Sequence, residues 1–297
     1  MNKSGIAVIV TTYNRPKALC WVLAGLAQQT CRPDSIVVAD DGSQASTRQL
    51  IDLIKIRWQE RGGMPNLIHV WQRDEGFRAG QIRNKAVAQC LSQKNQSPHH
   101  LIFLDGDCIP LPNFVAEHSK LIGKPSQQLS VAGGRTLISK ELTFKLEEEP
   151  EGEIFSKYDK LISTPQLIKW RVRGGLNRIL PLITLPDSFL RLSYARKWQS
   201  FRTCNVSIWT ADFVNVNGFN ENFVGWGFED SDLAIRLIRT GIKIKNGRFA
   251  TNVLHLWHPE FSRSNAETNK ALLENSWSSD IKASRGLDEH TESASWG

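Results

Sequence analysis

The sequence lacks several features that would assign it to a class of small metal-binding or membrane-spanning proteins. Its five cysteines include no CxxC pair and no metal-finger spacing, which argues against a zinc module. No apolar run approaches the ~20 residues that a membrane-spanning helix needs. The N-terminus, "MNKSGIAVIVTTYN", enters a strand-like segment almost at once, so we expect no signal peptide. The odd cysteine count then favours a reducing, cytoplasmic setting.

Two nucleotide-binding motifs are also missing. The stretch "GFRAG" is not a GxGxxG, and no GxxxxGK[ST] is present, which argues against a classical dinucleotide site and against a P-loop. At 297 residues the chain can bury a full core, as one large domain or two small ones. Its composition is that of an ordinary globular protein.

The positive charge is concentrated in one segment. Residues 169–202 hold eight Lys and Arg and one acid, Asp187, so this segment alone accounts for the net charge of +7 of the whole chain. Its apolar content, "LNRILPLITLPDSFLRL", fits an anionic membrane surface or an acidic lipid-linked partner better than nucleic acid. Pro181 and Pro186 argue against one long helix and favour two short amphipathic pieces. The alternative is a basic face packed on the acidic run at 145–153 of the same chain.

Strand-like and helix-like segments alternate in the first hundred residues. The expected strands are 6–13, 35–40, 67–72 and 101–105, and helix-like spacing fills the stretches between them. This alternation predicts an α/β fold with a parallel sheet. Ligands bind at the carboxyl ends of the strands in such sheets, so we expect the residues that follow these strands to share one edge. They are Thr11–Arg15, Asp40–Ser43, Arg73–Arg78 and Asp105–Asp107.

The string "FLDGD" ends a buried strand with two carboxylates, Asp105 and Asp107, that repel each other. A divalent cation carrying a diphosphate would neutralise both, and Gly106 would let the backbone approach the phosphates. The ordinary alternative is a polar turn.

Other residues of this edge suit a nucleotide. An Asp in "ADDGS" can accept a hydrogen bond from a uracil ring, although the string taken alone favours a tight turn that caps the next helix. Thr11 and Tyr13 could form a platform for a base and ribose. Arg78 and Arg83 suit phosphate or base contacts, or else line a solvated helix face.

The string "GWGFEDSD" at 225–232 places a Trp between two glycines and three acids at the start of a helix. The helix dipole favours acids there, but it does not explain the Trp. A Trp ring and a carboxylate are what a sugar site uses, for stacking and for taking a hydroxyl proton. In "HLWHPE", either His255 or His258 could complete the shell of a divalent ion.

Taken in order, "VIVTTYNRP", "VVADDGS", "GFRAGQIRN" and "FLDGD" resemble a family 2 glycosyltransferase with the GT-A fold. "NVNGFNENFVGWGFEDSDLAIRL" is similar to the C-terminal region of β-1,4-galactosyltransferases and bacterial chondroitin-polymerase-type enzymes. The resemblance covers roughly residues 5–138 and 201–260. It implies a Rossmann-like nucleotide-binding half with a mostly parallel central sheet, fused to a smaller α+β acceptor-binding region.

The resemblance also implies roles for individual residues. Asp230 would be the catalytic base, Glu229 an acid that binds the acceptor, and Trp226 would lie over donor and acceptor. Asp107 and His255 would bind Mn²⁺ or Mg²⁺, with His258 as the substitute for His255. The nucleotide-sugar would contact Thr11, Tyr13, Arg15, Asp41, Arg78, Arg83, Asp105 and Gly106. Phe228 stands where galactosyltransferases have glycine and Ser231 interrupts their acidic run, so galactose is not assumed as the donor.

We therefore expect an inverting, metal-dependent transferase that moves a sugar from a UDP-sugar to a glycan or lipid-linked saccharide, for a cell-surface polysaccharide. The expected parts are a nucleotide-sugar half (1–140), a basic insertion (141–200), an acceptor and base region (201–265) and a partly disordered helix and tail (266–297). The expected location is the cytoplasm, with peripheral contact between 169–202 and an anionic membrane, and no nucleic acid partner. The alternatives are a sugar nucleotidyltransferase, which would want a Gly-rich loop where "TTYNRP" stands, and a non-catalytic carbohydrate-binding relative.

Overall fold

The computed structural model describes residues 5–92, 97–259, 265–275 and 280–291. Its centre is one seven-stranded sheet with the strand order β3-β2-β1-β4-β8-β6-β9. The strands of this sheet are β1 (Ile6–Thr12), β2 (Ser35–Asp40), β3 (Asn66–Trp71), β4 (His100–Asp105), β6 (Leu129–Ala132), β8 (Asn205–Trp209) and β9 (Lys243–Asn246). A three-stranded sheet comprises β5 (Cys108–Pro110), β10 (Val253–His255) and β7 (Arg135–Leu137).

The strand directions confirm the predicted α/β class with a mostly parallel central sheet. Strands β3, β2, β1 and β4 run parallel to one another, and β6 and β9 are also parallel. Only β8 runs antiparallel to both of its neighbours. Because β8, β6 and β9 extend the sheet that begins with β1, the two expected halves share one sheet.

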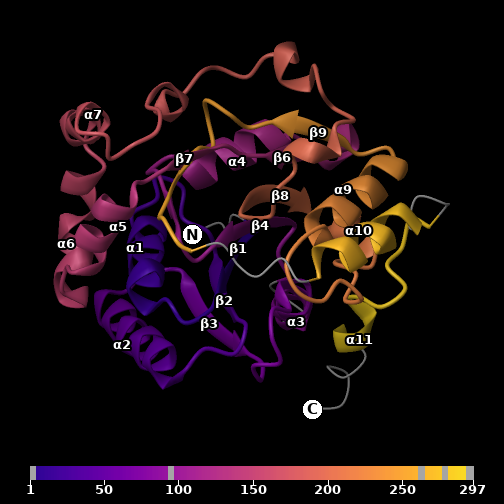
Figure 1. The fold of residues 1–297 in the computed structure, drawn as a ribbon, viewed down its shortest axis with the longest axis horizontal. Helices are drawn as coiled ribbons and strands as arrows, with labels where there is room; N and C mark the ends of the chain where they lie inside the picture. The colour runs from indigo at the N-terminus through magenta and orange to yellow at the C-terminus, as the bar shows by residue number, and fades with distance from the viewer. Residues whose placement is uncertain (1–4, 93–96, 260–264, 276–279, 292–297) are drawn as a thin grey trace.

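Helices cover both faces of the central sheet (Figure 1). The α-helices are α1 (Pro16–Ala27), α2 (Ala45–Arg61), α3 (Ala79–Leu91), α4 (Phe114–Ile122), α5 (Lys140–Glu147), α6 (Glu151–Leu161), α7 (Thr164–Val172), α8 (Thr210–Asn215), α9 (Glu229–Arg239), α10 (Ala266–Asn275) and α11 (Asp288–Thr291). The 3-10 helices are η1 (Pro125–Gln127), η2 (Leu180–Leu182), η3 (Phe189–Leu192) and η4 (Trp198–Ser200). Among the described residues, no helix combines the length and the apolar character needed to cross a bilayer.

The continuous apolar run of β1 is buried on both faces of the sheet. Val8 and Val10 belong to the core that α1, α2 and α6 complete, whereas Ala7 and Ile9 belong to the core that α3 and α9 complete. Since successive side chains of a strand point to opposite faces, a strand between two helical layers must be apolar at every position. This is why β1 shows no polar alternation.

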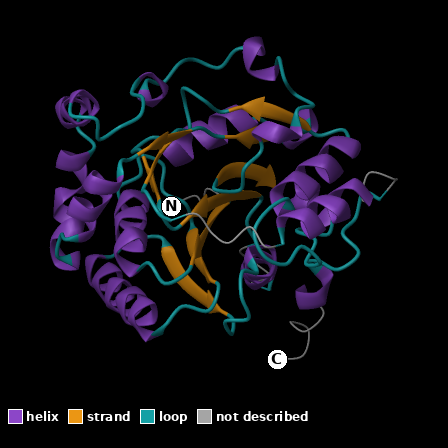
Figure 2. Cartoon of the chain, viewed as in Figure 1, coloured by secondary structure: helices purple, strands orange, loops and turns teal. Residues whose placement is uncertain are grey.

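The basic segment consists of α7, three 3-10 helices and connecting loop, and Figure 2 shows that most of 173–204 is loop. The two short amphipathic pieces expected from the sequence therefore do not form. The cations of 169–202 also make no ion pair with the acids of 147–153 in the part of the chain that the structure describes. Four of those acids, Glu147, Glu149, Glu151 and Glu153, pair with Arg15, Lys17 and Lys157.

Residues 280–291 of the C-terminal region contact the rest of the chain. Leu287 is buried, and the Nε2 atom of His290 lies 2.7 Å from Oε1 of Glu221. The backbone N–H of Ala283 donates to the carbonyl of Val216. Residues 280–291 thus pack on the loop that precedes α9, and the expectation that 266–297 is partly disordered stays a prediction. Residues 276–279 and 292–297 lie outside the described part.

Candidate active site

The ends of the parallel strands meet at one edge, as the pattern predicts. Thr12 of β1 is paired with Asp40 of β2, and Thr11 is paired with Asp105 of β4. The backbone N–H of Gly106 then donates to the carbonyl of Thr11. A Cβ atom on Gly106 would lie 2.9 Å from that carbonyl oxygen, so only glycine fits where the chain leaves β4.

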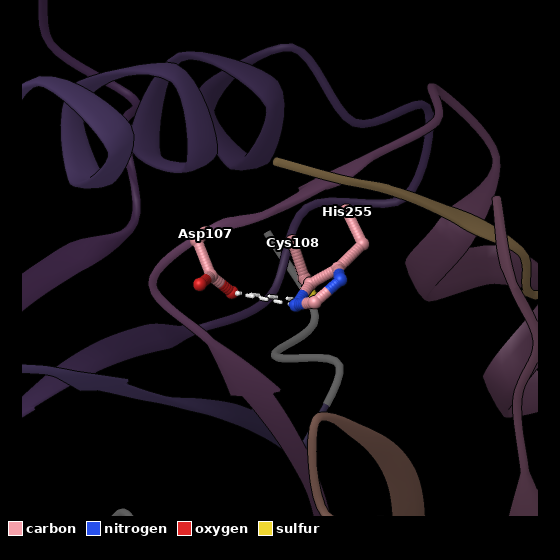
Figure 3. A group of neighbouring side chains, drawn as sticks. All are labelled: Asp107, Cys108 and His255. Carbon is pink, nitrogen blue, oxygen red and sulfur yellow. Dashed lines mark hydrogen bonds and ion pairs between the residues drawn. The ribbon is translucent and has the colours of Figure 1, made fainter. Parts of the chain in front are cut away.

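Strand pairing brings a histidine beside the second acid of "DGD". In the small sheet His255 of β10 is opposite Cys108 of β5, and the N–H of Leu256 donates to the carbonyl of Asp107. Figure 3 shows the carboxylate of Asp107 facing the imidazole of His255, and 3.4 Å separates Oδ1 from Nε2. One ligand atom from each of Asp107, Cys108 and His255 lies within 4.8 Å of the others. The Nε2 atom of His258 lies 3.7 Å from Oδ2 of Asp107.

The charges around Asp107 keep it ionised. Burial raises the pKa of Asp107, but the hydrogen bond and charge of His255, together with His258 and Arg15, outweigh burial and lower the pKa to about 2. Burial lowers the pKa of His255, and Asp107 reverses this and raises it. Burial also raises the pKa of the Cys108 thiol, which lies in the apolar core. Asp107 and His255 are therefore better suited than Cys108 to hold a divalent cation.

Arg15 occupies the other side of Asp107. Its Nη1 atom lies 3.0 Å from Oδ2 of Asp107, and its Nη2 atom contacts Oε1 of Glu147 at 2.6 Å and the carbonyl of Trp257 at 3.1 Å. Glu147 is the last residue of α5, in the segment where the sequence offered no motif. Sequence reasoning missed Glu147, because one acid in an acidic run carries no signal of its own.

The two acids of "ADDGS" have different hydrogen-bond partners. Asp40 accepts a hydrogen bond from the backbone N–H of Ser43 and lies 2.9 Å from Nε2 of His69, so it holds the turn. Asp41 accepts from Nε2 of Gln72 at 2.6 Å and from the backbone N–H of Arg78 at 2.8 Å. Burial raises the pKa of Asp41, although these two donors oppose the shift.

The other predicted nucleotide contacts lie around this turn. The hydroxyl of Tyr13 donates to Oδ2 of Asp74, a hydrogen bond that raises the pKa of this half-exposed tyrosine. A Cβ atom on Gly42 would lie 2.5 Å from the Cα of Asp74. The loops after β1, β2 and β3 are therefore in direct contact. Arg78 lies beside Glu75, with 3.7 Å between Nε and Oε2.

Arg83 joins the strand ends to the start of α9. Its Nε donates to Oγ1 of Thr11 at 2.9 Å, its Nη2 contacts Oδ1 of Asp105 at 3.0 Å, and its Nη1 lies 3.6 Å from Oε1 of Glu229. The Arg83 side chain is buried, and its guanidinium lies over the ring of Phe219. The structure thus places Arg83 between the two acidic groups of the site.

Glu229 and Asp230 occupy the first turn of α9. Burial and the adjacent charge of Asp230 raise the pKa of Glu229 to about 7, against the opposing effect of Arg83. Burial raises the pKa of Asp230, while Arg202 and Arg83 oppose the shift. The pair therefore holds a carboxyl group that exchanges its proton near neutral pH, as a general base requires.

The loop before α9 has an unusual backbone. Gly225 and Gly227 have φ values of +80° and +106°, and Phe228 adopts +73° without being a glycine. A side chain in this left-handed region is strained, and such strain is found at functional sites. Packing of Phe228 against Phe223, Ile235 and Leu273 offsets the strain. Trp226 is partly exposed on this loop.

Asn269 of α10 holds the same loop from behind. Its buried side-chain amide donates to the carbonyls of Val224, Trp226 and Gly227, and the amide of Asn265 also donates to Val224. Sequence reasoning missed both asparagines, since nothing in the local sequence indicates contact with a loop some forty residues earlier. The structure shows that α10 supports the loop.

Two family models and several known proteins match this sequence. The model of "Glycosyl transferase family 2" matches residues 7–176, and that of the "N-terminal domain of galactosyltransferase" matches 187–259. The chain is 30% identical over 250 residues to validoxylamine A glucosyltransferase of Streptomyces hygroscopicus subsp. limoneus, covering 82% of this chain and 50% of that protein. It is 24% identical over 285 residues to chondroitin synthase of Escherichia coli, covering 91% and 37%. The chain thus spans half the length of the first relative and less of the second.

Solved structures show the same fold. S. aureus TarS in complex with UDP-GlcNAc aligns with a TM-score of 0.55 at 16% identity, covering 96% of this chain and 69% of that one. The mannosyltransferase PcManGT from Pyrobaculum calidifontis, in complex with GDP-Man and Mn²⁺, aligns with a TM-score of 0.55 at 14% identity, covering 99% and 70%. Both likenesses concern the arrangement of the chain.

Proposed function

The chain belongs to glycosyltransferase family 2, and from this premise we propose that it transfers a sugar from a UDP-sugar to a hydroxyl group of a glycan or lipid-linked saccharide. The observation that carries the proposal is the contact network of Arg83. It joins the strand ends beside Asp107 to the acidic start of α9. A donor held at the strand ends and an acceptor held at α9 would meet along this network.

The donor side of the proposal uses Thr11, Tyr13 and Asp41 for the uridine, with Arg78 beside them. Asp41 still has lone pairs for a ring N–H after accepting its two protein donors. Asp107 and His255 would hold Mn²⁺ or Mg²⁺, and His258 is the substitute ligand. The bound cation would neutralise charge that develops on the departing diphosphate. PcManGT was crystallised with Mn²⁺, and TarS with UDP-GlcNAc, which supports a nucleotide-sugar donor here.

The acceptor side uses Asp230 as the base and Glu229 as an acceptor-binding acid, with Trp226 over the sugars. Asp230 would take the proton of the acceptor hydroxyl while that oxygen forms a bond to the anomeric carbon. The bond from that carbon to the diphosphate breaks on the opposite face, so one displacement inverts the configuration. Arg83 would act as a positioning residue. Its guanidinium lies between the carboxylates of Asp105 and Glu229, orients both and neutralises part of their negative charge.

The parts of the chain follow from these roles. We assign donor binding to 1–140 and acceptor binding and the base to 201–265, and 266–297 is the C-terminal helix and tail, of which α10 supports the acceptor loop. The insertion 141–200 supplies Glu147 to Arg15 and carries the basic segment. We assign to residues 169–202 a peripheral contact with an anionic membrane, which would bring α9 toward a lipid-linked acceptor, because η4 packs against α9.

Thermal unfolding with UDP and a panel of UDP-sugars, with Mn²⁺ and then with EDTA, tests the proposal. We expect a rise in Tm that needs both nucleotide and ion, because a ligand that binds only the folded state stabilises it. The UDP-sugar that gives the largest rise identifies the donor. No rise with any uridine nucleotide would contradict the proposal, and pyrophosphate release from a nucleoside triphosphate would favour a nucleotidyltransferase.

A further inference from the structure

The loop between α7 and β8 exposes large apolar side chains. Phe189 is 83% exposed, Leu190 65%, Leu180 64%, Ile183 54% and Leu185 48%. Single exposed apolar residues are common on protein surfaces, whereas several from one loop indicate an interaction site. In Figure 1 this stretch runs along the outside of the molecule, between α7 and β9.

A buried arginine fixes this loop in place. Arg191 is 8% exposed, and its guanidinium donates to the carbonyls of Leu185 at 2.8 Å, Asn246 at 2.9 Å and Arg248 at 2.6 Å. The N–H of Leu185 donates to the carbonyl of Phe249. If the loop turned so that its apolar side chains faced inward, the hydrogen bonds of Arg191 would break and its buried positive charge would lose its partners. These hydrogen bonds therefore keep the apolar side chains facing outward. Arg191 is therefore a structural cation and not part of the basic surface.

The remaining charges of the segment select the partner. Seven cations on either side of residues 180–190 are exposed: Lys169, Arg171, Arg173, Arg178, Arg196, Lys197 and Arg202. The one acid of the segment, Asp187, lies 2.7 Å from the ammonium group of Lys245. A second copy docked symmetrically on this face would bring these cations against one another, which like-charge repulsion opposes. A surface that is both apolar and anionic matches both features.

We propose that residues 180–190 form an apolar wedge that inserts into the interfacial layer of an anionic lipid bilayer, while the flanking cations contact the lipid headgroups. The proposal deepens the membrane contact assigned above to 169–202 and rests on it, but not on the transfer reaction. Apolar burial and electrostatic attraction add in such docking. Binding should therefore weaken with salt but keep a part that salt does not remove.

Co-sedimentation with phosphatidylglycerol/phosphatidylcholine vesicles tests the wedge. We expect the double variant Phe189→Ser/Leu190→Ser to bind at least about tenfold more weakly at low and at high salt, because two large apolar side chains no longer enter the lipid. The control is Leu53→Ser/Ile56→Ser, which removes two apolar side chains, 51% and 53% exposed, from α2 and should bind as wild type does. The variant Arg196→Gln/Lys197→Gln should lose binding mainly at low salt.

The outcomes separate this proposal from its alternatives and from the proposed function. Unchanged vesicle binding by Phe189→Ser/Leu190→Ser would overturn the wedge, as would binding by wild type that high salt abolishes completely. A wild-type dimer in light scattering that this variant converts to a monomer, without vesicle binding, would assign the loop to a second copy and also overturn it. All three double variants should melt as wild type does and keep the Tm rise with UDP and Mn²⁺. Vesicle binding without any nucleotide-dependent rise would reject the transferase and leave the wedge standing.

Discussion

Arg15 and Asp107 are 92 residues apart in the chain, and their side chains meet at 3.0 Å between Nη1 and Oδ2. Arg15 thus supplies a positive charge beside the carboxylate that we assign to the divalent cation. Glu147 holds the same guanidinium from the other side. Arg15 therefore neutralises part of the negative charge of Asp107, and a bound cation would have to share Asp107 with Arg15.

Replacing Arg15 should change metal and nucleotide binding in opposite directions. Without the guanidinium, Asp107 is expected to bind Mn²⁺ about threefold to tenfold more tightly in the absence of nucleotide, because the positive charge of Arg15 no longer repels the ion. Binding of UDP should weaken by a similar factor. Mn²⁺ titration by electron paramagnetic resonance and UDP titration by calorimetry measure the two effects for Arg15→Ala. The control is Arg61→Ala, at the exposed end of α2. An equal loss of affinity for Mn²⁺ and for UDP in Arg15→Ala would contradict this account.

Asp230→Asn should separate catalysis from binding. We expect the rate of transfer to fall by about 100- to 10,000-fold, the usual contribution of a general base. UDP binding in the presence of Mn²⁺ should stay near the wild-type value, since Asp230 lies at the start of α9 and not at the strand ends. Asp159→Asn, on the exposed face of α6, should leave both unchanged. Wild-type transfer by Asp230→Asn would place the base elsewhere.

The acid pair on α9 predicts a pH dependence. The pKa of Glu229 is raised from 4.5 to about 7, so between these values the folded chain keeps a proton that the unfolded chain has lost. Stability should therefore fall as the pH rises through this window. The ratio kcat/KM should rise through the same window as the pair becomes ionised. In Glu229→Gln the rising limb should move to lower pH, because Asp230 no longer has a charged neighbour. An unmoved limb would assign the titration to another group.

Asn269→Ala should loosen the loop before α9. The change leaves three carbonyls, including those of Trp226 and Gly227, without this donor, and we expect a loss of about 1–3 kcal/mol of stability. Hydrogen exchange of residues 224–229 should become faster, and KM for the acceptor should rise more than the affinity for UDP falls. Lys270→Ala, the exposed neighbour on α10, is the control. Unchanged exchange in Asn269→Ala would mean that α10 does not hold the loop.

Gly106→Ala tests the close approach of β4 to β1. The added Cβ would meet the carbonyl oxygen of Thr11 at 2.9 Å and the side chain of Thr12 at 3.0 Å. We expect a loss of about 1–3 kcal/mol from forced displacement of the strand ends, together with weaker UDP binding. In Gly152→Ala on α6 the new Cβ would lie 3.7 Å from Nη2 of Arg57, an ordinary contact distance, so this variant should be neutral or slightly stabilising. Normal UDP affinity in Gly106→Ala would show that the strand ends tolerate the shift.

The first half of the fold could be predicted from sequence because its signals are local. The apolar runs of β1 and β4 and the periodic helices between them predict both the elements and the edge where their ends meet. Thr11 and Asp105 could be placed together for the same reason, since neighbouring parallel strands bring equivalent ends into register.

Contacts between distant segments could not be predicted in this way. Nothing near Glu147 indicates that it meets Arg15, and nothing near Asn269 indicates the carbonyls that it holds, because both contacts depend on how whole elements pack. The short strands β5, β6 and β7 also lack a clear signal, since three or four residues carry too little periodicity. From the sequence alone Arg191 is grouped with the other cations of 169–202, because a count of charges contains no information about burial.

The antiparallel position of β8 has a consequence for how the chain folds. The strands β1, β2 and β3 pair through successive βαβ units of short sequence separation, whereas β4 must return past β2 and β3 to pair with β1, and β8 must return across the insertion to bind β4. Contacts that close a long loop form slowly, because the loop entropy must be lost before they stabilise anything. We therefore expect the edge formed by β1, β2 and β3 to assemble early and the contact between Arg83 and Glu229 to form last. In this order of events the nascent chain acquires a nucleotide-binding surface before it acquires a base, so donor binding and transfer should recover with different time courses after refolding.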